Sequence, residues 1–264
     1  MQSAPLSFGQ LVRTLRTTSF NVVETRHPIG MVIEPHEHEH ACLNLVLQGH
    51  YHEAYAHAGG EFPPLSACFK PAGESHSNCF ERASARCLLI EIRDEGLVAP
   101  GVDLHRRVWT RDPYAASLGL RIWRELADPD GVSSLSIDEW VLELFTSLLG
   151  EGSARLSGSA RLHSAVEALH DAPRQPWTLS RLALQVGLHP SHLARAFRTR
   201  HGCTIGEYQR RLRLNEAARR LALGDEPLSS LSMDLGFADQ SHCTRAFRRQ
   251  FGTTPAKYRR VFRG

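Results

Sequence analysis

The chain has 264 residues, of which 42% are hydrophobic and 22% are charged, and its formal net charge is +3. This composition is that of an ordinary globular protein and excludes a disordered, collagen-like or disulfide-scaffold chain. No apolar run approaches the roughly 18–20 residues that a helix needs to span a bilayer.

The charge is divided unevenly along the chain. Residues 1–160 contain 13 Lys and Arg against 20 Asp and Glu, a net charge of −7, whereas residues 161–264 contain 18 against 8, a net charge of +10. A basic half of this kind indicates nucleic acid or another anionic surface as its partner, and a solvated basic face without a partner is the alternative.

The first residues, Met1 to Leu6, lack the basic segment followed by an apolar stretch that marks a secretory signal. We therefore expect a cytoplasmic protein that has no contact with a membrane. The six cysteines show no Cys-x-x-Cys spacing, so we expect reduced and mostly buried thiols rather than disulfides.

Residues 20–93 have the pattern of short strands separated by turns. Leu43, Leu45 and Leu47 alternate with other residues before Gly49, and residues 86–92 form another apolar run. Repeated short strands with Pro and Gly turns predict an antiparallel sandwich or a small barrel, which we assign to a first domain over residues 1–100.

Histidines are concentrated in this first domain, where seven of the fifteen lie between His36 and His76. The pattern Gly30-x5-His36-x-His38, followed by Pro71-Ala-Gly-x-x-His76, resembles the two motifs of cupins, although the second motif lacks its leading Gly and its distal Asn. The resemblance implies a cupin-like β-barrel and a metal site with two His and a Glu from the first motif and a His from the second. Here Cys42 stands in the place of the Glu. The candidate ligands are therefore His36, His38, His76 and Cys42.

In a single strand, the even-numbered residues His36, His38, His40 and Cys42 would share one face. Three imidazoles and a thiolate suit zinc or another borderline divalent metal. The alternatives are an organic effector bound without metal, and no ligand at all.

Residues 101–150 show a helical pattern on both sides of the turn signal Asp128-Pro-Asp-Gly131. The apolar positions are Leu118, Ile122, Leu126, Ile137, Trp140, Val141, Leu144, Phe145 and Leu148. They predict a helical hairpin that forms a dimerisation surface or, alternatively, covers the core of the first domain. The Gly- and Ser-rich stretch that follows predicts a flexible linker over residues 151–160.

The basic half, residues 161–264, contains an internal repeat. The segments 191–198 and 241–248 share six of eight residues at an offset of 50, and the segments just before them match at an offset of 49. Each copy has a short helix pattern, then Gly187 or Gly236, then a second helix. Since glycine adopts turn conformations that strain other residues, the repeat predicts two helix-turn-helix units.

The second helix of each copy has one apolar and one polar face. The apolar faces carry Leu193, Ala196 and Phe197 in the first copy and Cys243, Ala246 and Phe247 in the second. The polar faces carry Ser191, Arg195 and Arg198, and Ser241, Arg245 and Arg248. A guanidinium can bond two acceptors on one guanine edge, and Ser or His near a helix N-terminus can hold phosphate. The pattern therefore predicts two helices that read double-stranded DNA.

The stretch from Gly236 to Arg259, GFADQSHCTRAFRRQFGTTPAKYR, strongly resembles the AraC/XylS-type transcriptional regulators. The resemblance implies two helix-turn-helix subdomains joined by a long helix from about Gly206 to Leu223 and closed by Gly224. It also implies recognition helices near residues 190–200 and 240–250. Carried over by position, the DNA-binding residues are Ser191, His192, Arg195, Arg198, Gln240, Ser241, His242, Arg245 and Arg248. Two residues depart from the family pattern, Cys243 in place of a large apolar residue and His189 in place of a Ser cap.

The sequence thus predicts an α+β multidomain protein, with an N-terminal cupin-like β-barrel, a helical hairpin and an all-α double helix-turn-helix. We interpret it as a transcriptional regulator that binds DNA as a homodimer. The resemblance makes activation the expected mode, RNA polymerase a candidate partner, and a small molecule or metal in the first domain the effector. The rival interpretation is a metal-dependent cupin enzyme fused to a DNA-binding module. Cys42 in place of Glu, and the lack of a second acid–base cluster, favour a protein that is not an enzyme.

Overall fold

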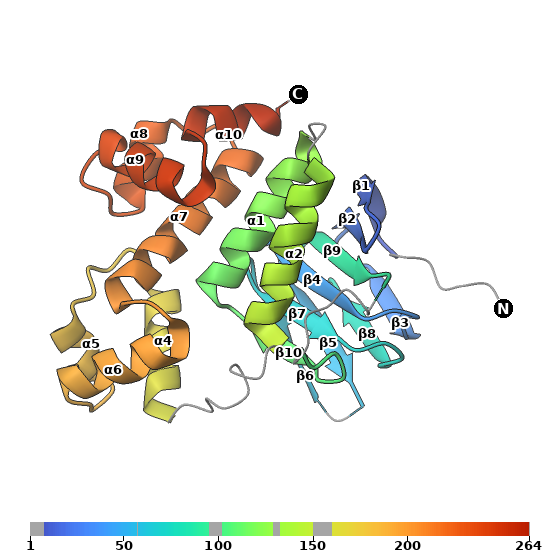
Figure 1. Cartoon of the computed structure of the whole chain (residues 1–264), viewed down its shortest axis with the longest axis horizontal. Helices are drawn as coiled ribbons and strands as arrows, with labels where there is room; N and C mark the ends of the chain where they lie inside the picture. Colours follow the sequence, from blue (N-terminus) through green and yellow to red (C-terminus); the bar gives the residue numbers. More distant parts are fainter. Residues whose placement is uncertain (1–7, 57, 95–101, 129–132, 150–159, 264) are drawn as a thin grey trace. The chain divides into compact units, whose positions relative to one another are not determined.

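A computed structural model describes residues 8–56, 58–94, 102–128, 133–149 and 160–263, and it shows strands in the first part of the chain and helices in the second (Figure 1). These residues form two compact units that divide between residues 151 and 152. The predicted linker lies outside the described residues, apart from Ala160, where helix α4 begins. None of the described helices is both long and apolar enough to cross a membrane.

The first unit contains two antiparallel sheets and two helices. The six-stranded sheet has the order β1-β2-β9-β4-β7-β10 and the four-stranded sheet the order β3-β8-β5-β6. The strands are β1 (Gln10–Arg16), β2 (Phe20–His27), β3 (Val32–His36), β4 (Cys42–Gln48), β5 (Tyr51–Tyr55), β6 (Ala58–Phe62), β7 (Ala67–Lys70), β8 (His76–Cys79), β9 (Ala85–Ile92) and β10 (Val108–Thr110). The predicted antiparallel β region is confirmed. Its likeness to a cupin barrel stays a prediction.

Helices α1 (Pro113–Ala127) and α2 (Ser133–Leu149) form the predicted hairpin, and they cover one face of the six-stranded sheet. The ring of Phe145 lies 6.0 Å from that of Phe20 and 5.7 Å from that of Phe69, centroid to centroid. The apolar positions of both helices are buried except for Trp140, which is half-buried. The hairpin therefore covers the core, whereas its role in dimerisation stays a prediction. Of the turn signal at 128–131, only Asp128 lies within the described residues.

The second unit is helical, and its helices follow the predicted repeat. Helices α5 (Leu179–Gln185) and α6 (Pro190–His201) form one pair, and α8 (Leu228–Asp234) and α9 (Gln240–Phe251) form the other. Helix α7 (Ile205–Leu223) runs between the two pairs, while α4 (Ala160–Asp171) and α10 (Pro255–Val261) complete the unit (Figure 1). Helix α7 begins one residue before the predicted start and is capped by Gly224, as predicted.

Candidate nucleic-acid interface and ligand pocket

Helix α6 is positioned by its buried face and by caps at both ends. Leu193 and Phe197 are fully buried in a core formed with α4, α5 and α7. At the N-terminus, the Nδ1 atom of His189 accepts from the backbone N–H of Ser191 at 3.4 Å and lies 2.8 Å from the Ser191 hydroxyl. The histidine that departs from the family pattern therefore still serves as the N-cap.

Helix α9 repeats this arrangement with different caps. Asp239 accepts from the backbone N–H of His242 at 2.6 Å, as expected of an N-cap aspartate. Cys243 and Phe247 are fully buried, and Ala246 is buried beside them. Cys243 thus fills the core position that the family pattern gives to a larger residue, and burial raises the pKa of its thiol above the usual value.

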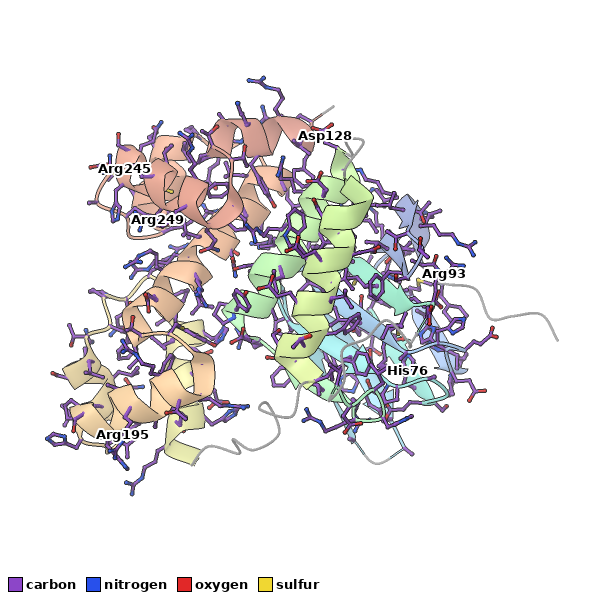
Figure 2. The ribbon with its side chains drawn as sticks, viewed as in Figure 1. His76, Arg93, Asp128, Arg195, Arg245 and Arg249 are labelled. Atoms are coloured by element: carbon purple, nitrogen blue, oxygen red, sulfur yellow. The ribbon has the colours of Figure 1, made fainter. Side chains whose placement is uncertain are left out.

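Both helices present their polar faces to solvent. All nine residues that were predicted to bind DNA are exposed: Ser191, His192, Arg195, Arg198, Gln240, Ser241, His242, Arg245 and Arg248. In the part of the chain that the structure describes, none of the four arginines among them forms an ion pair within 4.0 Å. Figure 2 shows the side chains of Arg195 and Arg245 near opposite ends of α7. The guanidinium groups are therefore available for a partner.

Other arginines of the second unit are held by the protein itself. Arg220 is paired with Glu226 and Asp234, and Arg219 with Glu216. Arg213 donates from Nε to the carbonyl of Pro173 at 2.7 Å and from Nη1 to that of Gly236 at 3.2 Å. Arg213, Arg219 and Arg220 of α7 are thus held by the protein, whereas the four predicted DNA-binding arginines of α6 and α9 are exposed.

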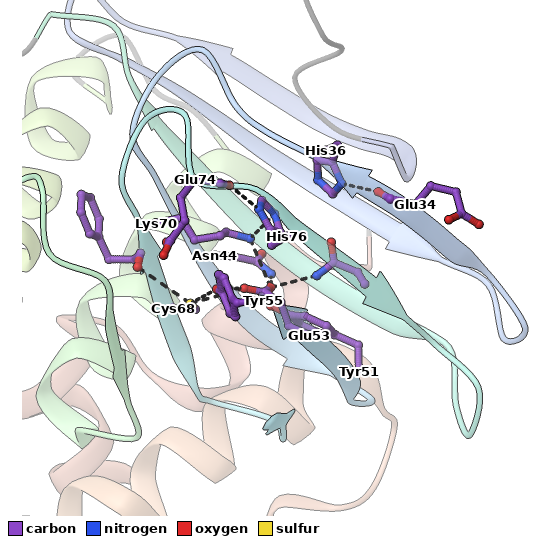
Figure 3. Close-up of polar contacts among 12 residues, drawn as sticks. Glu34, His36, Asn44, Tyr51, Glu53, Tyr55, Cys68, Lys70, Glu74 and His76 are labelled. Atoms are coloured by element: carbon purple, nitrogen blue, oxygen red, sulfur yellow. Dashed lines mark hydrogen bonds and ion pairs between the residues drawn. The ribbon is translucent and has the colours of Figure 1, made fainter. Parts of the chain in front are cut away.

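In the first unit, the structure brings together three of the four predicted metal ligands. One nitrogen each from His36, His38 and His76 lies within 4.8 Å of the other two. The Nδ1 atoms of His36 and His76 each lie 2.9 Å from a backbone carbonyl, of Glu34 and Glu74 respectively (Figure 3). A carbonyl only accepts, so both Nδ1 atoms carry the proton and both Nε2 atoms keep a lone pair.

Cys42 is not part of this cluster, and the expected set of four ligands is corrected to three. Strand β3 ends at His36 and β4 begins at Cys42, so residues 37–41 do not continue the alternation that was expected to align these side chains. Burial also raises the pKa of the Cys42 thiol to about 11.

A buried ion pair lies beside the histidines (Figure 3). The Lys70 Nζ atom is 3.2 Å from Oε2 of Glu53 and 3.3 Å from Nε2 of His76. Glu53 also accepts from Asn78 at 2.8 Å, from Tyr51 at 3.1 Å and from the hydroxyl of Tyr55. The carboxylate is fully buried and is surrounded by these four donors and by the thiol of Cys68, 3.7 Å away.

This environment shifts the pKa values of the charged groups and the imidazoles. Burial alone would raise the pKa of Glu53, but the Lys70 ammonium and the donors lower it to about 2. Burial would lower the pKa of Lys70, but the Glu53 carboxylate keeps it above its usual value. Burial and the Lys70 charge lower the pKa to about 3 for His38 and to about 4 for His76. The histidines are thus neutral at pH 7, the form in which imidazole binds a metal.

A pocket lies between the two sheets next to this network, with about 400 Å³ of empty space that includes open solvent. Its polar lining includes His36, His38 and Lys70. Its apolar lining is formed by Phe8, Ile33, Phe80 and Leu89. The pocket therefore combines apolar and polar side chains in one lining.

Comparisons with known proteins match the second unit. A family model described as a helix-turn-helix domain matches residues 182–261. The multiple antibiotic resistance protein MarA of Escherichia coli is 31% identical over 107 residues, which are 40% of this chain and 84% of MarA. The regulatory protein SoxS of Salmonella typhimurium is 36% identical over 79 residues, which are 30% of this chain and 74% of SoxS.

The chain belongs to the AraC/XylS family of transcriptional regulators. Solved structures of similar chains include an AraC-type regulator from Chromobacterium violaceum, at 26% identity and a TM-score of 0.37 over 38% of this chain and 90% of that one. ToxT from Vibrio cholerae covers 94% of this chain and 100% of its own at 11% identity and a TM-score of 0.40.

Membership of the AraC/XylS family makes this chain a DNA-binding transcriptional regulator. The family model lies within the second unit, so the match says nothing about the pocket of the first unit. Sequence reasoning missed Lys70, Glu53 and Asn78. They are far apart in the chain and meet only because β7, β5 and β8 face the same interior, so no spacing in the sequence signals them.

Proposed function

We propose that this AraC/XylS regulator reads two successive major grooves of one DNA duplex with α6 and α9. The 19 residues of α7 separate the two helix-turn-helix units, and at 1.5 Å per residue they span about 28 Å. One turn of B-DNA is about 34 Å, so the spacing suits two grooves on the same side of the duplex. The observation that carries the proposal is the repeated exposed face, with two arginines on each recognition helix that form no ion pair with any residue the structure describes.

Within this mode of binding, each exposed residue type has a distinct role. Arg195, Arg198, Arg245 and Arg248 supply guanidinium groups for base edges or phosphates. Ser191, His192, Gln240, Ser241 and His242 lie in the first turns of the two helices, where backbone N–H groups also favour phosphate. Neutralisation of phosphates by the basic half supplies most of the affinity, and the contacts to base edges supply the specificity.

A binding-site selection from a random duplex library tests this proposal. We expect two conserved blocks with centres about 10 base pairs apart, one for each recognition helix. We also expect affinity to fall steeply as salt concentration rises, because binding releases counterions. A selection that yields a single block, or binding that does not respond to salt, would contradict the proposal.

We further propose that the histidine pocket of the first unit is the effector site and that the protein acts as an activator. The three-imidazole cluster fits a transition metal. In His36 and His76, Nδ1 is hydrogen-bonded to a backbone carbonyl, so Nε2 has the lone pair that a metal ligand needs. Zinc or a similar divalent ion would be held by His36, His38 and His76. The apolar lining supports a second candidate, an organic effector, either alone or above the metal. Either ligand would act through a difference in affinity between two states of the protein.

Elemental analysis of the purified full chain decides between these ligands, with His36→Ala and His76→Ala as matched variants. Bound metal that is lost in both variants supports the metal. If wild-type protein holds no metal even after exposure to excess ion, the organic effector remains as the candidate. We propose that the protein binds its operator as a homodimer and contacts RNA polymerase there. Transcription from the selected operator by RNA polymerase, measured with and without added zinc, then tests whether the ligand activates. We propose no catalytic role, since the relatives are transcription regulators.

A further inference from the structure

The side chain of Lys70 is hydrogen-bonded to Nε2 of His76, the nitrogen whose lone pair a metal at the histidine cluster would need. Its Nζ atom lies 3.3 Å from Nε2 of His76, on the nitrogen that faces away from the backbone carbonyl of Glu74. Because Nδ1 of His76 donates to that carbonyl, Nε2 is the acceptor, and the ammonium group donates to it. The lysine thus makes the contact that a bound cation would make.

The cluster of His36, His38 and His76 is suited to bind a cation rather than an anion. His36 has the same arrangement as His76, with Nδ1 donating to the carbonyl of Glu34 and Nε2 left as an acceptor. The imidazoles of His36 and His76 lie 4.3 Å apart, centroid to centroid, and His38 lies 5.2 Å from each. Neutral imidazoles arranged in this way offer lone pairs to a cation and have few donors for an anion.

Lys70 cannot move far from this position, because Glu53 holds it. The Glu53 carboxylate is 3.2 Å from Nζ and is itself fixed by the amide of Asn78 and the hydroxyls of Tyr51 and Tyr55. Both side chains of the ion pair are almost completely buried, with 5% of the Lys70 side chain and none of the Glu53 side chain exposed. A metal that takes Nε2 of His76 would therefore bind with an ammonium group still close to it.

We propose that Lys70 is an internal competitor for the metal and sets the affinity of the site formed by His36, His38 and His76. The inference rests on the proposed metal site and adds its regulation. A divalent ion has to displace the ammonium group from His76 and then bind against its charge, so the site fills only at higher concentrations of free metal. Lys70 thereby sets the concentration of metal at which the sensor responds.

The test compares Zn²⁺ binding to the full-length wild-type protein and to Lys70→Met, by competition with a chromophoric chelator. Methionine keeps most of the length of the lysine side chain and removes its charge. We expect the affinity of the variant for Zn²⁺ to rise by about tenfold or more, since a buried like charge and a competing hydrogen bond are both removed. Co²⁺ gives a second readout, because its visible absorption reports imidazole coordination directly.

Two further variants make the comparison decisive. Arg107→Met removes another cation of the same neighbourhood, since Arg107 lies 3.8 Å from the ring of Tyr55 and pairs with Glu74, but it does not contact an imidazole nitrogen. Its affinity for Zn²⁺ should change by less than about threefold. The double variant Lys70→Met/Glu53→Gln removes the buried carboxylate as well. It should show the same tightening, which keeps the test valid if the single variant does not fold.

The outcomes separate the inference from the proposed function. If Zn²⁺ binding depends on His76 but is no tighter in either Lys70 variant, the competitor role of Lys70 is wrong and the metal site stands. If no variant binds Zn²⁺ in a manner that depends on His76, the metal site itself is wrong and the inference falls with it.

Discussion

Gly187 and Gly236 adopt the same left-handed conformation, with φ of 66° and 74°, at equivalent turns of the two helix-turn-helix units. Their surroundings differ. A Cβ atom at Gly187 would meet nothing within 4 Å, whereas one at Gly236 would lie 3.4 Å from the carbonyl oxygen of Arg174 and from the guanidinium carbon of Arg213. The two turns thus have the same backbone conformation, but only the turn at Gly236 has neighbouring atoms close to the place of an added side chain.

Replacement of either glycine by alanine should destabilise its own helix-turn-helix unit. We expect Gly187→Ala to cost about 1–2 kcal/mol, which is the strain of a left-handed non-glycine residue. Gly236→Ala should cost more because of the added crowding. Hydrogen exchange of the backbone amides measures this, with faster exchange in α5 and α6 for the first variant and in α8 and α9 for the second.

Gly206 in α7 provides the matched control for these two changes. It has no positive φ, and a Cβ atom there would meet nothing within 4 Å. Gly206→Ala should therefore leave exchange unchanged or slow it, because alanine favours a helix more than glycine does. Equal destabilisation by all three alanines would show that the left-handed turns are not the cause.

The features that sequence predicted best are the local ones. The helix-turn-helix units and their glycine turns depend on residues within a few positions of each other, and the structure confirms them. The apolar faces of α6 and α9 were equally predictable, because helical periodicity relates residues three and four positions apart.

The pocket was predictable only in part, for a physical reason. His36 and His38 are close in the sequence, but Cys42 was assigned to the same face by an alternation that the loop between β3 and β4 interrupts. Glu53 and Lys70 are 17 residues apart and lie on strands of different sheets, so their contact depends on how the two sheets pack, and a buried ion pair has no pattern in the sequence. Long-range pairing therefore limits what the sequence reveals here.

The stability of the first unit should decrease as pH falls from about 6.5 to about 4, and His27 should contribute. Its ring is stacked on that of Phe80, 4.5 Å between centroids, and burial together with the Lys70 charge lowers its pKa to about 4. The unfolded chain then binds a proton that the folded chain excludes, so acid favours unfolding in this window. One such histidine contributes up to about 1.4 kcal/mol per pH unit.

Urea unfolding of the full chain at pH 7, 6 and 5 measures this dependence. His27→Phe retains the stacked ring but has no group to protonate, so its stability should fall less steeply with acid than that of the wild type. His52→Gln, at an exposed position in β5, is the matched control and should keep the wild-type slope. The role of His27 is wrong if the slopes of wild type and His27→Phe coincide.

Arg213 should fix the spacing of the two recognition helices. Besides its bonds to Pro173 and Gly236, it donates from Nη2 to the carbonyls of Arg174 at 3.3 Å and Gln175 at 3.2 Å. One side chain of α7 thus connects the segment before α5 with the turn before α9. Arg213→Met should weaken binding to a two-block operator by about tenfold, as expected for the loss of donors to several backbone carbonyls.

The ratio of affinities for two-block and single-block DNA is the decisive measurement for Arg213. The variant should lose affinity for the two-block site and keep its affinity for each block alone. Arg219→Met is the matched control, because Arg219 pairs with Glu216 within α7 and should not influence the spacing. A variant that loses affinity equally for every DNA would have a general defect instead.

Arg195 and Arg245 should each determine the base preference at a few positions of one block. Both side chains are exposed on the polar face of a recognition helix, and a guanidinium that bonds a guanine edge is worth about 1–3 kcal/mol of discrimination. Arg195→Ala should therefore relax the preference in one block only, and Arg245→Ala in the other. Lys257→Ala removes one exposed charge from α10 and should leave both preferences intact. Binding-site selection with each variant measures this, and an unchanged preference for Arg195→Ala and Arg245→Ala would show that these arginines contact the backbone of DNA rather than its bases.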